Sequence, residues 1–451
     1  MRRKAYALLS FVILASLVLS ACGAQATPTA TEPPATEPPE TEAPPTEPPI
    51  RDCASGLEGE TIVFNSQAGL TGPLSTILGL TFVNGMNDGA ADINAAGGIC
   101  GAMVEINLVD TQYDATQEVA AYQIIRDSDP MPFSISTYGS AASVVLAPLV
   151  NEDHVVNFAA GLNARAFYVP RDGWTVGVAP IYADQFAGFL DYVADNWETI
   201  KPEGAGDSIV VGVIGWDNAF GDGATTAETL AYAEGLGIAV LELEKHPLTA
   251  DADMVTPLQS LALQGANVIY YQGLGAWTAM LIGTIRALEM WDTVVVGGVN
   301  WSMNADVVNV LGESAAAMNG YYGVFPSLWW NDTDVPGVQQ VIAAFEAGGY
   351  PDSDKSVSYI LSYAGMYAWA TIVEAAIDDV GFENLDGDAF FDAFKAMGTV
   401  SALDLFTYDV RDGTRAPRVA QIRQAVFDGT NVNFVVVQDF FELPDMRPPA
   451  E

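Results

Sequence analysis

The chain has 451 residues, half of them hydrophobic, so it is long enough for two globular domains that each bury a core. Its formal net charge is −40, from 57 acidic and 17 basic residues. Because such a charge repels phosphate backbones, it argues strongly against nucleic acid as a partner. An acidic, solvated surface is typical of a soluble protein that works outside the cell.

Residues 1–22 have the pattern of a secretory leader. Arg2, Arg3 and Lys4 precede an apolar run over residues 5–19, which is too short to span a bilayer comfortably. The run ends in L-S-A-C-G, which resembles a bacterial lipobox, so we expect cleavage before Cys22 and acylation of its thiol. A plain secretory signal cleaved after Ala21 is the alternative. The expected location is extracytoplasmic, with a lipid anchor at the outer face of the cell membrane.

Residues 23–57 follow as a linker rich in Thr, Glu and Pro. The segment repeats Thr-Glu-Pro-Pro and has almost no apolar residue, so it cannot bury surface. We expect an extended, polyproline-like, disordered tether whose repeats reach roughly 70 Å at about 3.1 Å per residue. Such a tether would leave the folded part free to reach a membrane partner.

The pattern after the tether predicts a strand, a helix and a second strand. Residues 62–65 form a short apolar run, and the glycines around Gly72 break it with a tight turn. Apolar residues recur at helical spacing over 77–93, Gly97 and Gly98 stop that helix, and residues 104–109 form the next strand. A glycine-bearing turn of this kind leaves backbone N–H groups at a helix N-terminus, where a carboxylate can bind.

The same stretch carries a family resemblance. L-T-G-P-L at 70–74, D-I-N-A-A-G-G-I-C-G at 92–101 and V-D-T-Q-Y-D-A-T at 109–116 closely resemble the opening of the extracytoplasmic receptors of branched-chain amino-acid ABC transporters. The likeness extends from Glu60 to Val437. It implies a type I periplasmic-binding-protein fold, in which two parallel-sheet, Rossmann-like lobes are joined by three hinge crossings and close on a small ligand.

The resemblance and the alternation of strands with helices divide the folded part. We expect lobe 1 at 58–178 and 326–405, lobe 2 at 179–325 and 406–442, and a loose tail at 443–451. The apolar stretch Ser358 to Ile377 has helical periodicity and polar side chains, so it predicts a core helix rather than a membrane span.

Two cysteines remain once Cys22 is set aside. Cys53 precedes the first strand and Cys100 precedes the second, and neighbouring parallel strands start at the same edge of a sheet. We expect a bridge between them in a secreted protein, stabilising the fold by a few kcal/mol. Two unpaired buried thiols are the alternative.

The resemblance implies a ligand site on lobe 1. Gly72 lies in the first turn, and Ser140 matches the family's serine at a helix N-terminus, although a serine helix cap without a ligand is the plain alternative. Residues 155–163 stand where the family usually has Ser-Pro-Ser-Ala-Thr-Asn, and Gly161 or Leu162 takes the place of the threonine that commonly contacts the ligand. The backbone N–H groups of Ala160 and Gly161 are then the expected carboxylate donors.

On lobe 2 the resemblance implies aromatic contacts and one important departure. Phe220 matches a ligand-facing Tyr of the family, and we expect Trp301 to pack on the apolar end of a ligand. Trp329 and Trp330, in the second segment of lobe 1, are candidates for the same contact, and a core or hinge role is the alternative. Tyr359 would also face the cleft. Asn300 falls where amino-acid-binding members carry an acid that pairs with the ligand ammonium. Since Asn is neutral, an α-amino acid becomes less secure as the ligand.

The sequence shows no catalytic motif. It lacks G-x-S-x-G and the phosphate-binding G-x-x-x-x-G-K-[ST], and its two histidines, His154 and His246, are far apart. We therefore expect a monomeric, cofactor-free and metal-free binding protein, not an enzyme. It would deliver a small, partly apolar solute that bears a carboxylate or an amide, such as an amino acid or an analogue, to an ABC permease. A sensory module reporting the ligand to a receptor is the alternative, and a hydrolase is a remote one.

Overall fold

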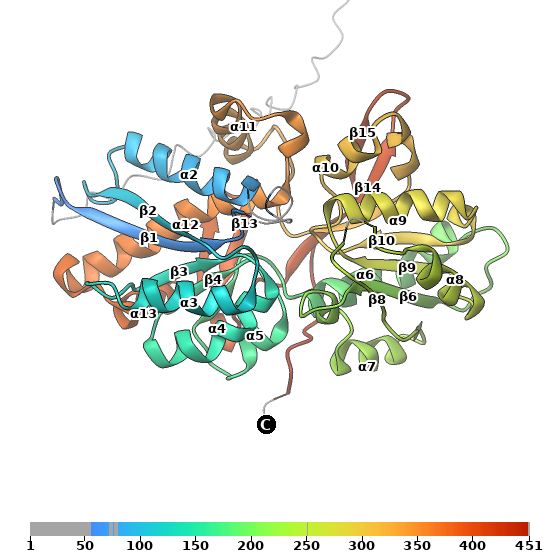
Figure 1. The fold of residues 1–451 in the computed structure, drawn as a ribbon, viewed down its shortest axis with the longest axis horizontal. Helices are drawn as coiled ribbons and strands as arrows, with labels where there is room; N and C mark the ends of the chain where they lie inside the picture. Colours follow the sequence, from blue (N-terminus) through green and yellow to red (C-terminus); the bar gives the residue numbers. More distant parts are fainter. Residues whose placement is uncertain (1–55, 72–74, 76–79, 250, 450–451) are drawn as a thin grey trace, which may run out of the picture. The chain divides into compact units, whose positions relative to one another are not determined.

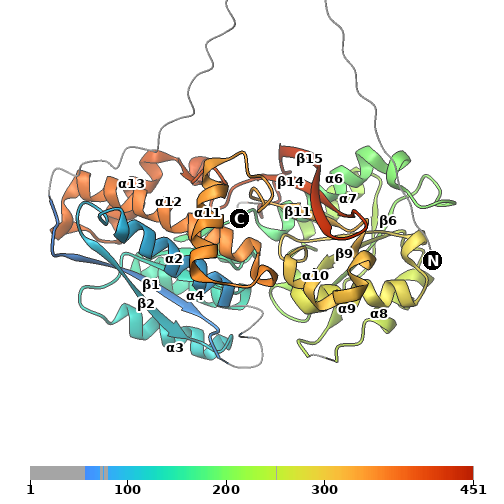
Figure 2. The same ribbon diagram turned by 90° about the horizontal axis from the view of Figure 1, so that it is seen from above.

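The computed structural model describes residues 56–71, 75, 80–249 and 251–449. They form two α/β lobes, which Figures 1 and 2 show from two directions. In lobe 1, five parallel strands lie in the order β2-β1-β3-β4-β5. The strands are β1 (Thr61–Ala68), β2 (Met103–Asp110), β3 (Ser134–Thr137), β4 (Val156–Ala159) and β5 (Thr175–Gly177).

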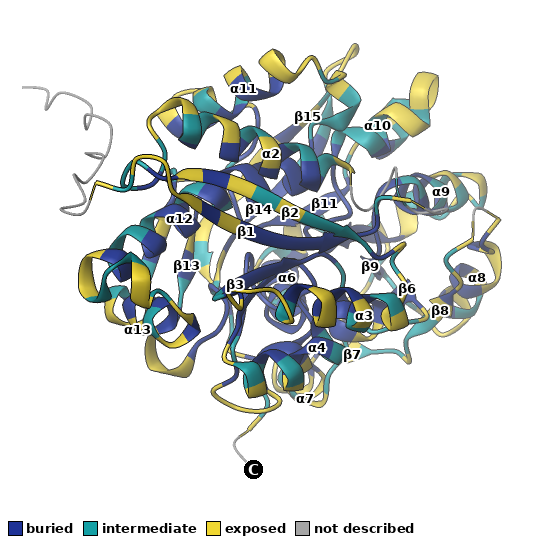
Figure 3. Ribbon diagram, turned by 60° about the vertical axis from the view of Figure 1, so that its left-hand side comes forward, coloured by how far each residue is buried: buried dark blue, intermediate teal, exposed yellow. Residues whose placement is uncertain are grey.

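Helices cover both faces of this sheet, as a parallel sheet requires. Figure 1 shows α2 on one side of the strands and α3 on the other, and the central strand β3 is buried along its whole length (Figure 3). The helices of lobe 1 are α2 (Leu80–Ala95), α3 (Ala115–Arg126), α4 (Ser140–Asp153), α5 (Ala164–Tyr168), α11 (Pro336–Gly348), α12 (Val357–Val380) and α13 (Gly387–Met397).

The predicted strand, helix and strand at the start of the fold are confirmed as β1, α2 and β2. Helix α2 buries Phe82, Met86 and Ile93, which recur at the expected spacing. Gly97 and Gly98 end the helix with φ angles of 111° and 76°, a backbone that favours glycine. A Cβ on Gly98 would lie 2.0 Å from the carbonyl oxygen of Ala102, so the turn needs glycine for space as well.

Helices α2 and α12 cross with their backbones in contact. A Cβ on Gly85 would lie 2.3 Å from Ser362 Oγ and 2.6 Å from the carbonyl oxygen of Tyr359. Among the described residues, α12 is the one helix whose length and apolar composition would suit a membrane span, but 72% of its apolar window is buried inside the protein. The expectation of a core helix is therefore confirmed.

Lobe 2 contains an eight-stranded mixed sheet in the order β15-β14-β11-β10-β9-β6-β7, with β8 pairing to β6. Strands β6 to β11 are parallel, and β14 and β15 add an antiparallel hairpin at one edge. The strands are β6 (Val210–Trp216), β7 (Ala239–Val240), β8 (Glu244–His246), β9 (Val268–Gln272), β10 (Val295–Gly298), β11 (Tyr322–Phe325), β14 (Val419–Phe427) and β15 (Val432–Glu442). The helices are α6 (Tyr182–Ile200), α7 (Ala227–Gly235), α8 (Val255–Leu263), α9 (Gly275–Ala287) and α10 (Ala305–Leu311).

In lobe 2, residues 239–246 form two short strands and not one continuous strand. Ala239 pairs with Val210, whereas Glu244 pairs with Ile214, so the pairing has advanced by one residue between them. The extra residue interrupts the ladder and leaves two short strands, β7 and β8.

The chain crosses between the lobes three times, which confirms the predicted topology. It leaves lobe 1 after β5, returns after β11, and passes back to lobe 2 between β13 (Phe406–Asp409) and β14. Strand β13 forms a two-stranded antiparallel sheet with β12 (Thr399–Ala402).

Residues 443–446, directly after β15, are packed, which corrects the expectation of a loose tail for this part of 443–451. Leu443 and Met446 are buried. The side chain of Leu443 fills the space that Gly188 leaves on α6, where a Cβ would lie 2.3 Å from Leu443 Cδ2. The N–H of Met446 donates to Asp184 Oδ1 at 2.8 Å. The acidic and Pro-rich composition of the tail predicts a loose segment, because Leu443 and Met446 are its only large apolar residues.

This packing predicts that Leu443→Ala lowers the free energy of unfolding by about 2–4 kcal/mol, because it removes a buried side chain and leaves a cavity. Urea denaturation measures the change, and Leu263→Ala, at a position 90% exposed, is the matched control. A loss no larger than that of the control would mean that the tail is loose.

Candidate functional site

A small cavity lies between the two lobes, and nine residues line it. Lobe 1 and lobe 2 both contribute to the lining, which consists of Tyr113, Tyr138, Gly139, Ser140, Ala160, Tyr182, Phe220, Leu274 and Trp301. Most of these residues follow the carboxyl ends of strands, among them β3, β4, β6, β9 and β10. Ligands of open α/β sheets bind at this edge. Four of the residues predicted for the site, Ser140, Ala160, Phe220 and Trp301, are thus brought together.

The cavity is narrow, because side chains of the two lobes meet across it. Its volume is about 20 Å³, which is room for a group the size of a water molecule. It adjoins a second cavity of about 50 Å³ that shares Tyr138, Leu274 and Trp301 with it. A solute as large as an amino acid can therefore enter only if the lobes separate or these side chains move.

Helix α4 points its N-terminus at the cavity. Gly139 precedes the helix with φ 118°, and no side chain caps the first turn. The first N–H groups of a helix have no partner within the helix and carry the positive end of its dipole. Ser140, at the first helical position, is buried and donates a hydrogen bond from Oγ to the hydroxyl of Tyr182 at 3.3 Å. This helix end can receive an anionic or carbonyl oxygen.

The structure gives Ala160 and Gly161 roles that differ from the predicted one, which was to donate backbone N–H groups to a carboxylate. Ala160 lines the cavity, but its N–H already donates to the carbonyl oxygen of Thr137 at 2.9 Å, so that N–H is not free for a carboxylate. Gly161 lies behind the lining and touches the start of α4. A Cβ on Gly161 would lie 2.3 Å from the carbonyl carbon of Gly139 and 2.5 Å from Ser140 Cα. Gly161 therefore permits the close approach that sets the position of Ser140.

Gly161→Ala is expected to displace the start of α4 and to lower the free energy of unfolding by about 1–3 kcal/mol, because the new methyl group would overlap backbone atoms. Chemical denaturation measures this loss. Gly235→Ala, where nothing lies within 4 Å of the added atom, is the control and should be neutral or slightly stabilising. Equal stability of the two variants would contradict the contact.

Tyr182, Phe220 and Trp301 form the wall that lobe 2 presents. The rings of Tyr182 and Phe220 meet edge to face with centroids 5.0 Å apart. The indole Nε1 of Trp301 donates to the Tyr182 hydroxyl at 3.1 Å. Burial raises the pKa of Tyr182 to about 12. The wall is therefore apolar except at one point, where the Tyr182 hydroxyl meets Trp301 and Ser140.

Three of the lining tyrosines were not predicted. Tyr113 lies in the V-D-T-Q-Y-D-A-T motif, Tyr138 immediately follows β3, and Tyr182 opens α6 after the first crossing. Tyr113 has a left-handed backbone with φ 59°, and its ring occupies the space beside Gly139, where a Cβ would be 2.6 Å from Tyr113 Cε2. The signal in the sequence that could have indicated these residues is an aromatic side chain directly after a strand or a crossing. The family resemblance indicated other positions.

Asn300 is buried beside the lining residue Trp301 without lining the cavity itself. Its backbone N–H donates to Gln185 Oε1 at 3.1 Å. Neither polar atom of its side chain has a hydrogen-bond partner among the described residues. This amide is neutral, and the cavity lining contains no charged side chain. Asp306 and Asp354 line the adjoining cavity, and burial raises the pKa of Asp306 to about 6.

Other predicted residues lie away from the cavity or outside the described part of the chain. Tyr359 is buried between α2 and α12, where its hydroxyl donates to Asp88 Oδ2 at 2.6 Å, so its expected place in the cleft is wrong. Trp329 and Trp330 line a separate groove of about 470 Å³ beside α10 and β15. Cys100 is disulfide-bonded, while Cys53, Gly72 and Cys22 lie outside the described residues. The pairing of Cys53 with Cys100 and the acylation of Cys22 therefore stay predictions.

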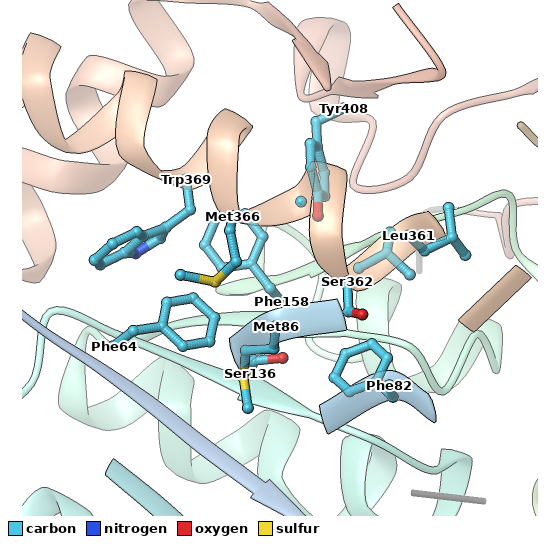
Figure 4. A pocket seen from close by; sticks show the side chains of 12 residues that line it. Phe64, Phe82, Met86, Ser136, Phe158, Leu361, Ser362, Met366, Trp369 and Tyr408 are labelled. Carbon is cyan, nitrogen blue, oxygen red and sulfur yellow. The ribbon is translucent and has the colours of Figure 1, made fainter. Parts of the chain in front are cut away.

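A further cavity, of about 20 Å³, lies inside lobe 1. Figure 4 shows its lining, with Phe64, Met366 and Trp369 on one side and the Tyr408 hydroxyl pointing inward. The lining rings and methionines belong to the core between α2, α12 and the sheet. A space this small, enclosed by core side chains, is a packing gap and not a ligand site.

Behind the lobe 1 wall, Glu118 is a buried acid. Its carboxylate accepts hydrogen bonds from Gln67 Nε2 at 2.6 Å and Thr111 Oγ1 at 2.8 Å. No cation pairs with it in the described part of the chain. Burial raises the pKa of Glu118 to about 7, although both hydrogen bonds act in the opposite direction.

Glu118 predicts a pH dependence of stability. Its pKa is about 7 in the folded chain against an ordinary value of 4.5, so between these pH values the folded state holds a proton that the unfolded chain releases. The free energy of unfolding therefore falls as the pH rises from 4.5 to 7. Between pH 5 and 7.5 the fall should be smaller in Glu118→Gln than in the wild type by about 1–3 kcal/mol.

Urea midpoints at both pH values give this comparison. Glu346→Gln, on the exposed face of α11, is the control and should keep the wild-type pH dependence. An identical pH dependence in Glu118→Gln would contradict the assignment.

The two lobes, the three crossings and the interlobe cavity define a two-lobed solute-binding protein. The chain matches the model of the periplasmic binding protein family over residues 68–430 and belongs to that family. Membership in a family of binding proteins confirms that the chain is not an enzyme. A Pseudomonas aeruginosa amino acid binding protein is 23% identical over 314 residues, which cover 68% of this chain and 78% of that protein.

Solved structures share the fold at low identity. A branched-chain amino acid ABC transporter protein from Thermus thermophilus, with bound valine, has a TM-score of 0.70 at 16% identity, covering 86% of this chain and 97% of that one. A fatty acid ABC transporter substrate-binding protein from Thermomonospora curvata has a TM-score of 0.71 at 17% identity, covering 87% and 95%. A solute-binding protein from Rhodopseudomonas palustris, in complex with 3,4-dihydroxybenzoic acid, has a TM-score of 0.67 at 17% identity, covering 85% and 98%.

Proposed function

We propose that this protein captures a small solute with a carboxylate or amide group, no ammonium group and a partly apolar body, and delivers it to an ABC permease. The observation that carries the proposal is the lining of the interlobe cavity. It consists of aromatic rings, hydroxyls and the uncapped start of α4, with no charged side chain. Such a lining suits an apolar body with one oxygen-bearing end.

The oxygen-bearing end is assigned to the Ser140 side of the cavity. The free N–H groups of the first turn of α4 and its dipole favour negative charge. The Ser140 hydroxyl and the Trp301 indole N–H lie at the same place, where both donate to the neutral Tyr182 hydroxyl. Held in this way, a carboxylate or an amide oxygen needs no Arg or Lys.

An ammonium group would find no acidic side chain in this lining. Asn300 is neutral, and its amide lies behind the wall. Taking an ammonium out of water without a counter-ion is costly. The aromatic rings of Tyr182, Phe220 and Trp301 offer contact area to an apolar body instead.

Delivery to an ABC permease is supported by the similar proteins, which include ABC transporter components with the same fold. The leader ending at Cys22 and the tether at 23–57 suit a lipid-anchored receptor on the outer face of the membrane. A small solute and a membrane permease are then the two partners, and the protein would act as a monomer.

A thermal-shift comparison of matched solutes tests the proposal. Leucine is compared with 4-methylpentanoate and 4-methylpentanamide, and phenylalanine with 3-phenylpropanoate and 3-phenylpropanamide. We expect at least one amine-free solute to raise the melting temperature more than its parent amino acid, since a ligand at 100 times its Kd stabilises by about 2.7 kcal/mol. Sodium acetate at equal concentration controls for salt. A strong response to leucine with none to any amine-free acid or amide would refute the proposal.

A further inference from the structure

We infer that Tyr182 is a specificity-determining residue of the cleft: its hydroxyl donates a hydrogen bond to an oxygen of the solute. The inference rests on the proposed function and deepens it, because it names the group that distinguishes an oxygen acceptor from an amine. Tyr182 lies at the first position of α6, directly after the first crossing.

Two donors converge on the Tyr182 hydroxyl, one from each lobe. Ser140 Oγ of lobe 1 donates at 3.3 Å, and Trp301 Nε1 of lobe 2 donates at 3.1 Å. An indole N–H can only donate. The oxygen of Tyr182 therefore accepts from both sides, and no described residue accepts a hydrogen bond from its own proton. That proton is left for a solute oxygen in the cavity that all three residues line.

The ring of Tyr182 is held in place, so the donor has a defined position. Phe220 meets it edge to face at 5.0 Å, and a Cβ on Gly223 would lie 2.6 Å from Tyr182 Cδ2. The backbone N–H of Tyr182 donates to the carbonyl oxygen of Leu162 in lobe 1 at 3.0 Å. Both the backbone N–H and the hydroxyl of this residue thus contact lobe 1, and the hydroxyl meets Ser140 only when the lobes are together.

The hydroxyl stays a neutral donor across the physiological pH range, because burial raises its pKa to about 12. A solute oxygen placed against this hydroxyl accepts its hydrogen bond, in a cavity that no charged side chain lines. An ammonium group would instead place its N–H donors against the Tyr182 proton and the Trp301 N–H. The cleft should therefore select carboxylates, amides or ketones over amines, since a buried polar group left without a partner is costly.

The test is Tyr182→Phe, which removes one oxygen and retains the ring. The matched control is Tyr232→Phe, which loses the same atom from a hydroxyl that donates to Asp191 Oδ1, remote from the cavity. Isothermal titration measures the Kd for 3-phenylpropanoate, 4-methylpentanoate and their amides, with 3-phenylpropylamine as the amine probe. We expect Tyr182→Phe to raise the Kd for the acids and amides at least tenfold, and Tyr232→Phe to change it less than twofold.

An unchanged or lower Kd in Tyr182→Phe would overturn the inference, because it would mean that the hydroxyl only competes with the solute for Ser140 and Trp301. A wild-type protein that binds none of the acids or amides would contradict the proposed function, and the inference with it. Should Tyr182→Phe fail to fold, Trp301→Phe removes a hydrogen bond that orients the hydroxyl. It should then raise the same Kd values at least threefold, and an unchanged Kd would overturn the inference.

Discussion

The close approach of Gly161 to the start of α4 is the constraint on which the cleft depends. Without a Cβ, Gly161 lets the loop after β4 rest against Gly139 and Ser140. That contact places the Ser140 hydroxyl where it meets Tyr182 of the other lobe. Tyr182 in turn receives Trp301. Backbone packing in lobe 1 therefore fixes the position of the hydrogen bonds that connect Ser140, Tyr182 and Trp301 across the two lobes. The aromatic rings of the cavity surround these hydrogen bonds.

In our proposal, the absence of charge where Ser140, Tyr182 and Trp301 meet decides which solutes the protein binds. The chain carries a large excess of acids, yet none lines the cavity. The buried acid nearest to the lobe 1 wall, Glu118, is satisfied by Gln67 and Thr111 and has a raised pKa. The lining of the cavity itself is thus uncharged, although Asp306 and Asp354 line the adjoining cavity. Solubility and ligand choice can then be served by different residues.

Much of the fold could be predicted from the sequence, because strand and helix periods and the glycine turns are local signals. The succession of β1, α2 and β2 is an example. The family resemblance predicted the three crossings between the lobes. The tail was misjudged because two apolar residues, Leu443 and Met446, outweigh its polar composition. Tyr359 was misplaced because helical position alone does not tell which side of α12 faces α2. The tyrosines of the cleft were missed because their convergence depends on the packing of two lobes, which no local pattern encodes.

The central claim is that the lobes clamp a solute between them, and interlobe distances test it most directly. Spin labels at Ile124→Cys on α3 and Leu263→Cys on α8, both exposed positions, report the separation by pulsed electron resonance in a Cys22→Ser chain. The account predicts a broad distribution that shifts to shorter, narrower distances when an amine-free acid or amide binds. A solute that binds by calorimetry and leaves the distribution unchanged would contradict it.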